Sequence, residues 1–225
     1  MTENMPKSLV PISGEPFIAH QLRLLRSKEI TRVVLCAGFL GNSIQEFVGD
    51  GTKFGIDVSY SFDGGTLLGT AGAIGKALPL LDEAFFVLYG DSYLDCDYGR
   101  VAEAFESSER HGLMTIYRNA SHFDASNVEA QDGLIVRYDK RNQSSAMQHI
   151  DYGLGVFARS VFVNLAPNES HDLADVYQDL LQAGELASYE VTNRFYEIGS
   201  LTGIRDLEEH LMEHNPTTHE AVRTQ

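Results

Sequence analysis

The segment from Phe85 to Asp91, FFVLYGD, constrains the fold of this chain more than any other. Its five consecutive apolar or aromatic residues are typical of a strand buried on both faces, at the centre of a parallel sheet. Ligands of open α/β sheets bind beyond the carboxyl ends of the strands, where Asp91 would lie. A carboxylate there can hold a divalent cation against a phosphate. The simpler alternative is that Asp91 caps the next turn or helix.

The rest of the pattern alternates helices with strands, and this predicts a doubly wound, mainly parallel α/β sheet of the Rossmann-like type. An Asp132-Gly133 pair predicts one tight hairpin in the second half. We expect a single domain over residues 1–212 and a polar, disordered tail over 213–225. The expected strands are 32–37, 57–61, 85–89, 114–117, 128–131, 134–139, 152–157, 190–191 and 195–198. The expected helices are 17–27, a helix after Asn42 or Ser43 that carries Ile44, Phe47 and Val48, a helix ending at 81, 101–111, 172–183 and 201–212.

Composition excludes several classes of partner. The net charge of −15 argues against binding to a nucleic acid polymer or to an anionic membrane, because both need a basic face. It leaves room for a small phosphorylated substrate. The only cysteines, Cys36 and Cys96, suit a reducing compartment, and no apolar run reaches the roughly 20 residues of a membrane helix. We therefore expect a cytoplasmic protein.

A glycine-rich stretch, DGGTLLGTAGAIGKAL over residues 63–78, leads into the helix before the Phe85 strand. Backbone amides at a helix N-terminus can bind an anion or a polar ligand. Such a loop is by itself a weak signal and is often only a tight connection. Its position is more informative, because a ligand bound there would share a crevice with Asp91.

Five segments occur in an order that resembles the sugar-1-phosphate nucleotidyltransferases, in particular the small bacterial heptose-1-phosphate guanylyltransferases and N-acetylmuramate-1-phosphate uridylyltransferases. The resemblance extends from Thr2 to about Leu211. It implies a GT-A-like fold and a reaction that joins a nucleoside triphosphate to a sugar 1-phosphate, giving an NDP-sugar and pyrophosphate. The segments are PKSLVPISGEPFIAHQL, LLGTAGAI, FFVLYGDS, DYGLGVF and FYEIGS.

The resemblance also implies roles for individual residues. Asp91 would bind the catalytic Mg²⁺, Glu197 would be the second metal carboxylate, and Lys7 would contact triphosphate or pyrophosphate oxygens. Gly69 and Thr70 would line the nucleobase. A simple turn acid is the alternative for Glu197.

On the sugar side, the resemblance implies that Lys140 holds the sugar phosphate, with Asp139, Asp151 and Gly153 near the sugar. A solvated surface charge is the alternative for Lys140. GTP and UTP both remain open as the nucleotide, and the likeness of DYGLGVF and FYEIGS to heptose-type enzymes favours GTP with a heptose phosphate.

The chain departs from the family pattern at its start. Members of the family begin with a strand and a G-G-x-G-T-R loop, and the Pro-Lys motif comes after them. In this sequence the Pro-Lys motif, Pro6-Lys7, lies close to the first residue. That strand would lie between residues 32–37 and 85–89 in the order 3-2-1-4. We therefore expect a gap there, or direct pairing of the two strands, with impaired activity. An exposed sheet edge would also favour a homo-oligomer.

Two smaller departures accompany it. Glu15 replaces a lysine that is usual in the family, and Ser200-Leu201-Thr202 replaces T-P-E after Glu197.

Two alternatives come from other functional classes. One is a non-catalytic sugar-binding or nucleotide-binding module, which the missing phosphate-binding loop favours and the presence of Asp91 and Lys140 opposes. The other is a metal-dependent glycosyltransferase, because Asp95 and Asp97 form a D-x-D pattern. That pattern is short, and a polar turn after the strand explains it equally well.

Overall fold

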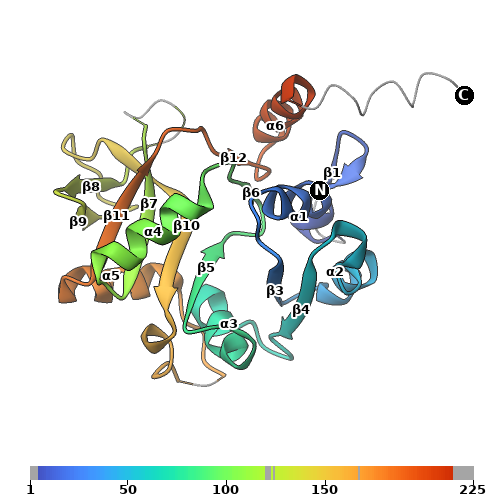
Figure 1. Ribbon diagram of the computed structural model, residues 1–225, viewed down its shortest axis with the longest axis horizontal. Coiled ribbons are helices and arrows are strands. Elements are labelled where there is room, and N and C mark those ends of the chain that lie inside the picture. The colour runs from blue at the N-terminus through green and yellow to red at the C-terminus, as the bar shows by residue number, and fades with distance from the viewer. Residues whose placement is uncertain (1–4, 120–122, 124, 167, 215–225) are drawn as a thin grey trace, which may run out of the picture.

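The computed structural model describes residues 5–119, 123, 125–166 and 168–214. Figure 1 shows a large sheet on one side of the molecule and a small two-stranded sheet on the other. Its helices are α1 (Phe17–Ser27), α2 (Gly41–Val48), α3 (Gly69–Ala77), α4 (Tyr98–Ser108), α5 (Leu173–Ala183) and α6 (Leu201–His214). Short 3-10 helices lie at Lys7–Leu9, Thr52–Phe54, Leu78–Leu80 and Arg159–Val161.

The large sheet has six strands in the order β5-β10-β7-β11-β9-β8. Among these strands only β7 and β11 pair in parallel, and the other pairings are antiparallel. The strands are β5 (Ala84–Leu88), β7 (Gly112–Arg118), β8 (Val128–Gln131), β9 (Leu134–Tyr138), β10 (His149–Ala158) and β11 (Leu186–Val191). The prediction of a mainly parallel sheet is therefore wrong for this sheet, although the α/β class is confirmed.

Within the described residues, three two-stranded sheets complete the fold. Strands β3 (Arg32–Ala37) and β4 (Asp57–Phe62) pair in parallel, as the sequence alternation predicted. The other pairs are β1 (Pro11–Ile12) with β2 (Glu15–Pro16), and β6 (Ser92–Tyr93) with β12 (Tyr196–Glu197).

Helices cover both faces of the large sheet. Along β7, Leu113 belongs to a hydrophobic cluster with residues of α1 and α4, and Met114 belongs to a second cluster with residues of α3 and α5. Because neighbouring residues of a strand point to opposite faces, the two clusters lie on the two sides of the sheet. The fold is thus doubly wound around a mixed sheet.

Strand β5 differs from its expectation as a central strand of a parallel sheet. It pairs antiparallel with β10, and Phe85 to Leu88 are half-buried rather than fully buried. Among the described residues β3 pairs only with β4, and β5 pairs only with β10. The gap expected between these strands is therefore present, and a cavity of about 640 Å³ lies there.

Local turn chemistry explains two element boundaries. Asp132 and Gly133 both have positive φ (52° and 78°), as the tight turn between β8 and β9 requires, so the predicted hairpin is confirmed. Helix α3 ends at Ala77 rather than near residue 81, because Pro79 has no backbone N–H to continue it.

The C-terminal helix α6 extends to His214, and most of the expected tail lies outside the described residues. The single-domain interpretation stays a prediction. Within the part of the chain that the structure describes, every helix is too short or too polar to cross a membrane.

Candidate active site

Asp91 lies just beyond the end of β5, beside the N-terminal segment of the chain. Its carboxylate Oδ2 is 3.3 Å from Lys7 Nζ, and both side chains are partly exposed, at 33% and 55%. The backbone N–H of Ile198 donates to the Asp91 carbonyl oxygen at 3.0 Å. Segments from the start, middle and end of the sequence therefore meet at Asp91.

Glu197 is brought close to Asp91 by strand pairing. In the β6–β12 ladder, Glu197 lies opposite Ser92, the residue that follows Asp91. The two acids expected to bind the metal thus come from neighbouring backbone segments, although 106 positions separate them in the sequence (197 minus 91).

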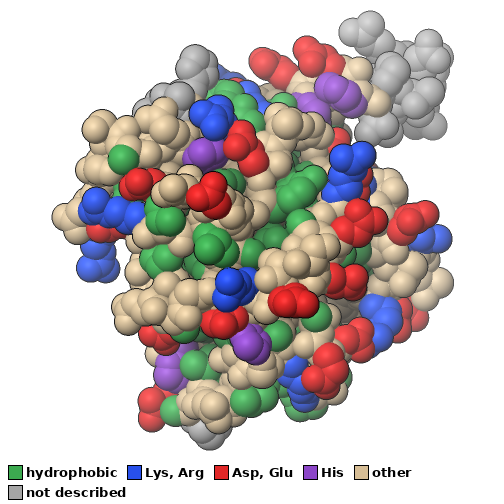
Figure 2. Space-filling model, turned by 60° about the vertical axis from the view of Figure 1, so that its left-hand side comes forward, with side chains coloured by type: hydrophobic (Ala, Val, Ile, Leu, Met, Phe, Trp, Pro, Cys, Tyr) green, Lys and Arg blue, Asp and Glu red, His purple; other side chains and the backbone are tan. Residues whose placement is uncertain are grey.

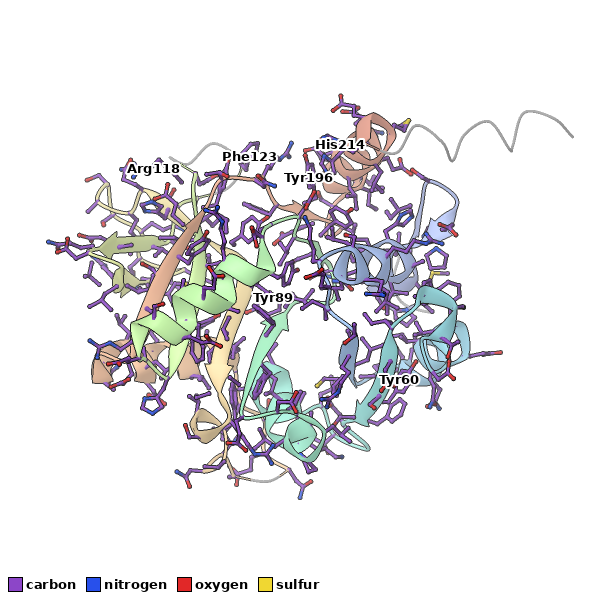
Figure 3. All side chains as sticks on the ribbon, in the orientation of Figure 1. Tyr60, Tyr89, Arg118, Phe123, Tyr196 and His214 are labelled. Atoms are coloured by element: carbon purple, nitrogen blue, oxygen red, sulfur yellow. The ribbon has the colours of Figure 1, made fainter. Side chains whose placement is uncertain are left out.

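Tyr89, which the sequence analysis did not single out, feels the charges of several acidic residues. Burial raises the pKa of its phenol, and the negative charges of Asp151, Asp172, Asp91 and Glu197 raise that pKa further. The charges of four carboxylates therefore act on one side chain at the end of β5; Figure 3 labels Tyr89 there. Tyr89 could have been singled out from the sequence because it directly precedes Gly90-Asp91.

The carboxylates suit a divalent cation. Within the described residues, no group of three or more His, Cys, Asp or Glu side chains could enclose a metal by itself. Mg²⁺ does not need such an enclosure, because it is usually held by one or two carboxylates together with substrate phosphates and water. Asp91 and Glu197 fit that donor set.

Asp151, in β10, forms an ion pair with Lys140, which lies just after β9. Lys140 Nζ is 3.8 Å from Asp151 Oδ2, and the Asp151 side chain is only 4% exposed. Tyr138 donates its hydroxyl to the same oxygen at 3.2 Å, and the Gly153 N–H donates to Oδ1 at 3.0 Å. Burial raises the pKa of Asp151, while the charge of Lys140 opposes that rise.

A bulge in β10 sets this geometry. The register between β10 and β7 shifts between Asp151 and Gly155, and Gly153 within the bulge has φ +94°. Asn127 Oδ1 accepts the Asp151 N–H at 3.0 Å and holds the bulge from the neighbouring segment. Bulges commonly redirect side chains next to active sites.

Asp139 has a local role in this arrangement. Its Oδ1 accepts the N–H groups of Arg141 and Asn142, each at 2.8 Å, and these bonds lower the pKa of the Asp139 carboxyl. The turn that they close carries Lys140. A direct contact between Asp139 and a sugar stays a prediction.

Gly69 and Thr70 begin α3 and line the cavity between β3 and β5. Gly69 has φ +69°, and a Cβ there would lie 2.5 Å from the carbonyl oxygen of His171. Thr70 Oγ1 donates to Asp172 Oδ1 at 3.2 Å and accepts from the Leu173 N–H at 2.7 Å. The loop is thus fastened to the start of α5, and its expected contact with a nucleobase stays a prediction.

The D-x-D pair has structural partners instead. Asp95 Oδ1 lies 2.5 Å from Lys28 Nζ, and Asp97 Oδ1 accepts the Arg100 N–H at 3.0 Å as the N-cap of α4. These contacts favour the polar-turn interpretation over a metal-dependent glycosyltransferase. Glu15, which replaces a lysine of the family, pairs with both terminal nitrogens of Arg23 at 2.5 and 2.9 Å.

Comparison with known proteins gives the family. The model of the family described as "Nucleotidyl transferase" matches residues 1–214. N-acetylmuramate alpha-1-phosphate uridylyltransferase of Neisseria meningitidis serogroup B is 24% identical, with 92% of this chain and 89% of that protein covered. D-glycero-alpha-D-manno-heptose 1-phosphate guanylyltransferase of Campylobacter jejuni is 23% identical, with 88% and 86% covered. Other relatives are longer, and this chain spans 54% to 59% of their length.

Among solved structures, HddC from Yersinia pseudotuberculosis complexed with GMP-PN aligns with a TM-score of 0.79 at 20% identity, covering 94% of this chain and 92% of that one. This likeness supports the fold. The chain belongs to the nucleotidyl transferase family. The resemblance to sugar-1-phosphate nucleotidyltransferases is therefore confirmed, and with it the prediction of an enzyme of that class. Enzymes of this family generally use a divalent metal, a nucleoside triphosphate and a sugar 1-phosphate.

Proposed function

We propose that the site around Asp91 transfers a nucleotidyl group from GTP or UTP to a sugar 1-phosphate, with Mg²⁺ as the metal. The observation that carries the proposal is the convergence of Lys7, Asp91 and the Glu197 strand at the end of β5. A phosphate oxygen of the sugar 1-phosphate would attack the α-phosphorus. The bond from that phosphorus to the bridging oxygen would break, and pyrophosphate would leave.

In this proposal the acidic residues bind the metal and the basic residue binds the phosphates. Asp91 and Glu197 would hold Mg²⁺, which offsets negative charge on the phosphates as the reaction proceeds. Lys7 is half-exposed, and its Nζ lies 3.3 Å from Asp91 Oδ2. When substrate binds, Lys7 would leave Asp91 and donate to triphosphate or pyrophosphate oxygens instead. Because such transfers need little covalent chemistry from the protein, positioning of the two substrates is the main task.

The sugar phosphate would bind beside β10. Lys140 is half-exposed and can contact a phosphate oxygen while the buried Asp151 carboxylate keeps its ammonium group in place. The Asp151 carboxylate and the Gly153 backbone would border the sugar. The heptose-type segments favour GTP with a heptose 1-phosphate, whereas the relative from Neisseria meningitidis is named as a uridylyltransferase.

The charge distribution supports small substrates over polymers. On the face shown in Figure 2, Lys and Arg side chains are scattered among Asp and Glu side chains and form no basic patch. We also place the protein in the cytoplasm, because Cys36 and Cys96 are both free thiols.

The test is release of pyrophosphate by the 225-residue chain with Mg²⁺, each nucleoside triphosphate in turn and a panel of hexose and heptose 1-phosphates. We expect release that requires Mg²⁺ and is greatest for GTP or UTP. Tight nucleotide binding that is indifferent to Mg²⁺, without any pyrophosphate, would instead identify the non-catalytic binding module.

A further inference from the structure

Two histidines, His210 and His214, lie next to each other in the last turn of α6. Positions four apart on a helix are neighbours on its surface. The centres of the two imidazole rings are 4.3 Å apart, and the ring planes are inclined by 38°. Two imidazoles bound side by side to one ion, with metal–nitrogen bonds of about 2.0–2.1 Å, have ring centres roughly 4.5–5 Å apart. The observed spacing is therefore close to that of two metal ligands.

A hydrogen bond fixes the orientation of the His214 ring. Its Nδ1 lies 2.9 Å from the carbonyl oxygen of His210. A carbonyl oxygen can only accept, so Nδ1 carries the proton, and in the neutral ring the lone pair is on Nε2. Metal-binding histidines characteristically donate their other ring N–H to a carbonyl or carboxylate oxygen in this way. His214 is thus held in a tautomer that suits a metal ligand.

Aromatic rings hold His210 in place. Its ring stacks on Tyr196 of β12, with the ring centres 4.5 Å apart and the planes inclined by 24°. It also meets Tyr93 of β6 edge to face at 6.0 Å. Figure 3 labels Tyr196 and His214, the two residues whose rings lie nearest to that of His210. The position of the His210 ring is therefore set before any ion binds.

The electrostatic surroundings keep His210 neutral. Burial lowers the pKa of its imidazole, and the nearby His214 lowers that pKa further. A neutral imidazole has the lone pair that a metal ion needs. The guanidinium of Arg194 also acts on His210, but it is paired with Asp206, and the carboxylates of Asp95 and Glu213 act in the opposite direction.

The sequence of this turn sets a limit on what the histidine pair can do. The run from His210 to His214, HLMEH, has the H-x-x-E-H pattern of one class of zinc peptidases. Catalytic zinc usually has three protein ligands, and no group of three or more His, Cys, Asp or Glu side chains in the described part of the chain could hold a metal. Glu213 and His214 are also exposed. The pattern therefore supports metal binding and gives no support to hydrolysis.

We propose that His210 and His214 form a binding site for a divalent transition-metal ion such as Zn²⁺, with water in the remaining coordination positions. Imidazole suits Zn²⁺, Ni²⁺ and Cu²⁺, whereas Mg²⁺ prefers oxygen ligands. The chemistry of this site thus differs from that of the carboxylates at the end of β5. A bound ion would link two successive turns at the end of α6. The simpler alternative is that His210 only packs on Tyr196.

Calorimetric titration of the full chain with ZnCl₂ tests the proposal. Excess Mg²⁺ is present to compete for carboxylate sites. His210→Gln and His214→Gln should each weaken zinc binding at least about tenfold, because each removes one of two protein ligands. His111→Gln is the matched control, since His111 is exposed, contacts Glu185 at the start of β7 and should not affect the zinc affinity. Absence of zinc binding, or equal losses in all three variants, would overturn the proposal.

A double variant separates a site on one helix face from binding by any two nearby histidines. Met212→His combined with His214→Gln keeps the number of histidines, but residues two apart on a helix do not face each other. Met212 is exposed, so circular dichroism should show an unchanged fold. Zinc should bind at least tenfold more weakly than to the original chain. Binding as tight as that of the original chain would overturn the paired site.

Electron paramagnetic resonance of the Cu²⁺ complex counts the imidazole ligands directly. We expect coupling to two imidazoles in the original chain and to one in His210→Gln or His214→Gln. Coupling to a single imidazole in the original chain would overturn the proposal and leave packing on Tyr196 as the role of His210. None of these measurements depends on nucleotidyl transfer, so the proposed function and this inference can fail separately.

Discussion

Lys7 and Asp91 lie 3.3 Å apart although 84 positions separate them in the sequence. The first described segment therefore supplies a cation to the carboxylate that follows β5. This contact joins the parts of the chain that the family resemblance had linked only by motif order. Both side chains are partly exposed, so the pair itself contributes little to stability and is free to rearrange around a ligand.

Asp91→Asn should lower the rate of pyrophosphate release by a factor on the order of 10² or more, because the amide cannot hold the metal that offsets phosphate charge. The measurement is turnover across a Mg²⁺ titration. Asp97→Asn is the matched control, since Asn caps a helix about as well as Asp and should keep both activity and fold. Unchanged turnover in Asp91→Asn would remove this residue from the metal site.

Lys140→Gln should raise KM for the sugar 1-phosphate more than it lowers kcat, because Lys140 would bind the substrate before and during the reaction alike. Arg141→Gln is the neighbouring control, because Arg141 contributes a backbone N–H to the turn and its exposed side chain is dispensable for that bond. Steady-state kinetics with varied sugar 1-phosphate would separate the two constants. Equal effects of both substitutions would indicate a general surface-charge effect.

Much of the fold was predictable because it depends on local patterns. The Asp-Gly hairpin, the buried run of β10 and the amphipathic face of α5 each carry their own signal, and all three elements are present. The position of β5 at the edge of the large sheet, paired antiparallel with β10, was not predictable. The same apolar run suits either a central or an edge strand.

The site divides in the same way. Motifs singled out Asp91 and Glu197 as candidates, but the pairing of β6 with β12 that brings their segments together could not be predicted from them. Similarly, the contact between Tyr138 and Asp151 depends on a bulge in β10 that no local residue pattern specified. Long-range register of this kind is set by packing.

Gly69→Ala should destabilise the protein by more than about 1 kcal/mol, because the residue has positive φ and its new methyl group would meet the His171 carbonyl. Gly65→Ala is the matched control in the same loop, since nothing lies within 4 Å of a Cβ at that position. Thermal unfolding of both variants is the measurement. Equal melting temperatures would contradict the close packing of the α3 start against the segment before α5.

Asp151→Asn should change how stability depends on pH. The folded pKa of Asp151 is raised above its ordinary value of 3.8 because burial disfavours the charged form. The folded state therefore keeps a proton that the unfolded state releases, and the contribution of Asp151 to stability falls as pH rises from about 4 through the folded pKa.

An amide does not titrate, so the stability of the Asp151→Asn variant should not show this decrease with rising pH. Its stability relative to the original chain should improve as pH rises through this window. Urea unfolding of both proteins at several pH values from about 4 to 8 measures the difference. The control is Asp132→Asn, at a turn position with positive φ that Asn also tolerates, and its difference from the original chain should not follow this trend. A difference for Asp151→Asn that instead grows less favourable with rising pH would show that the Lys140 ion pair outweighs the cost of burying the charge.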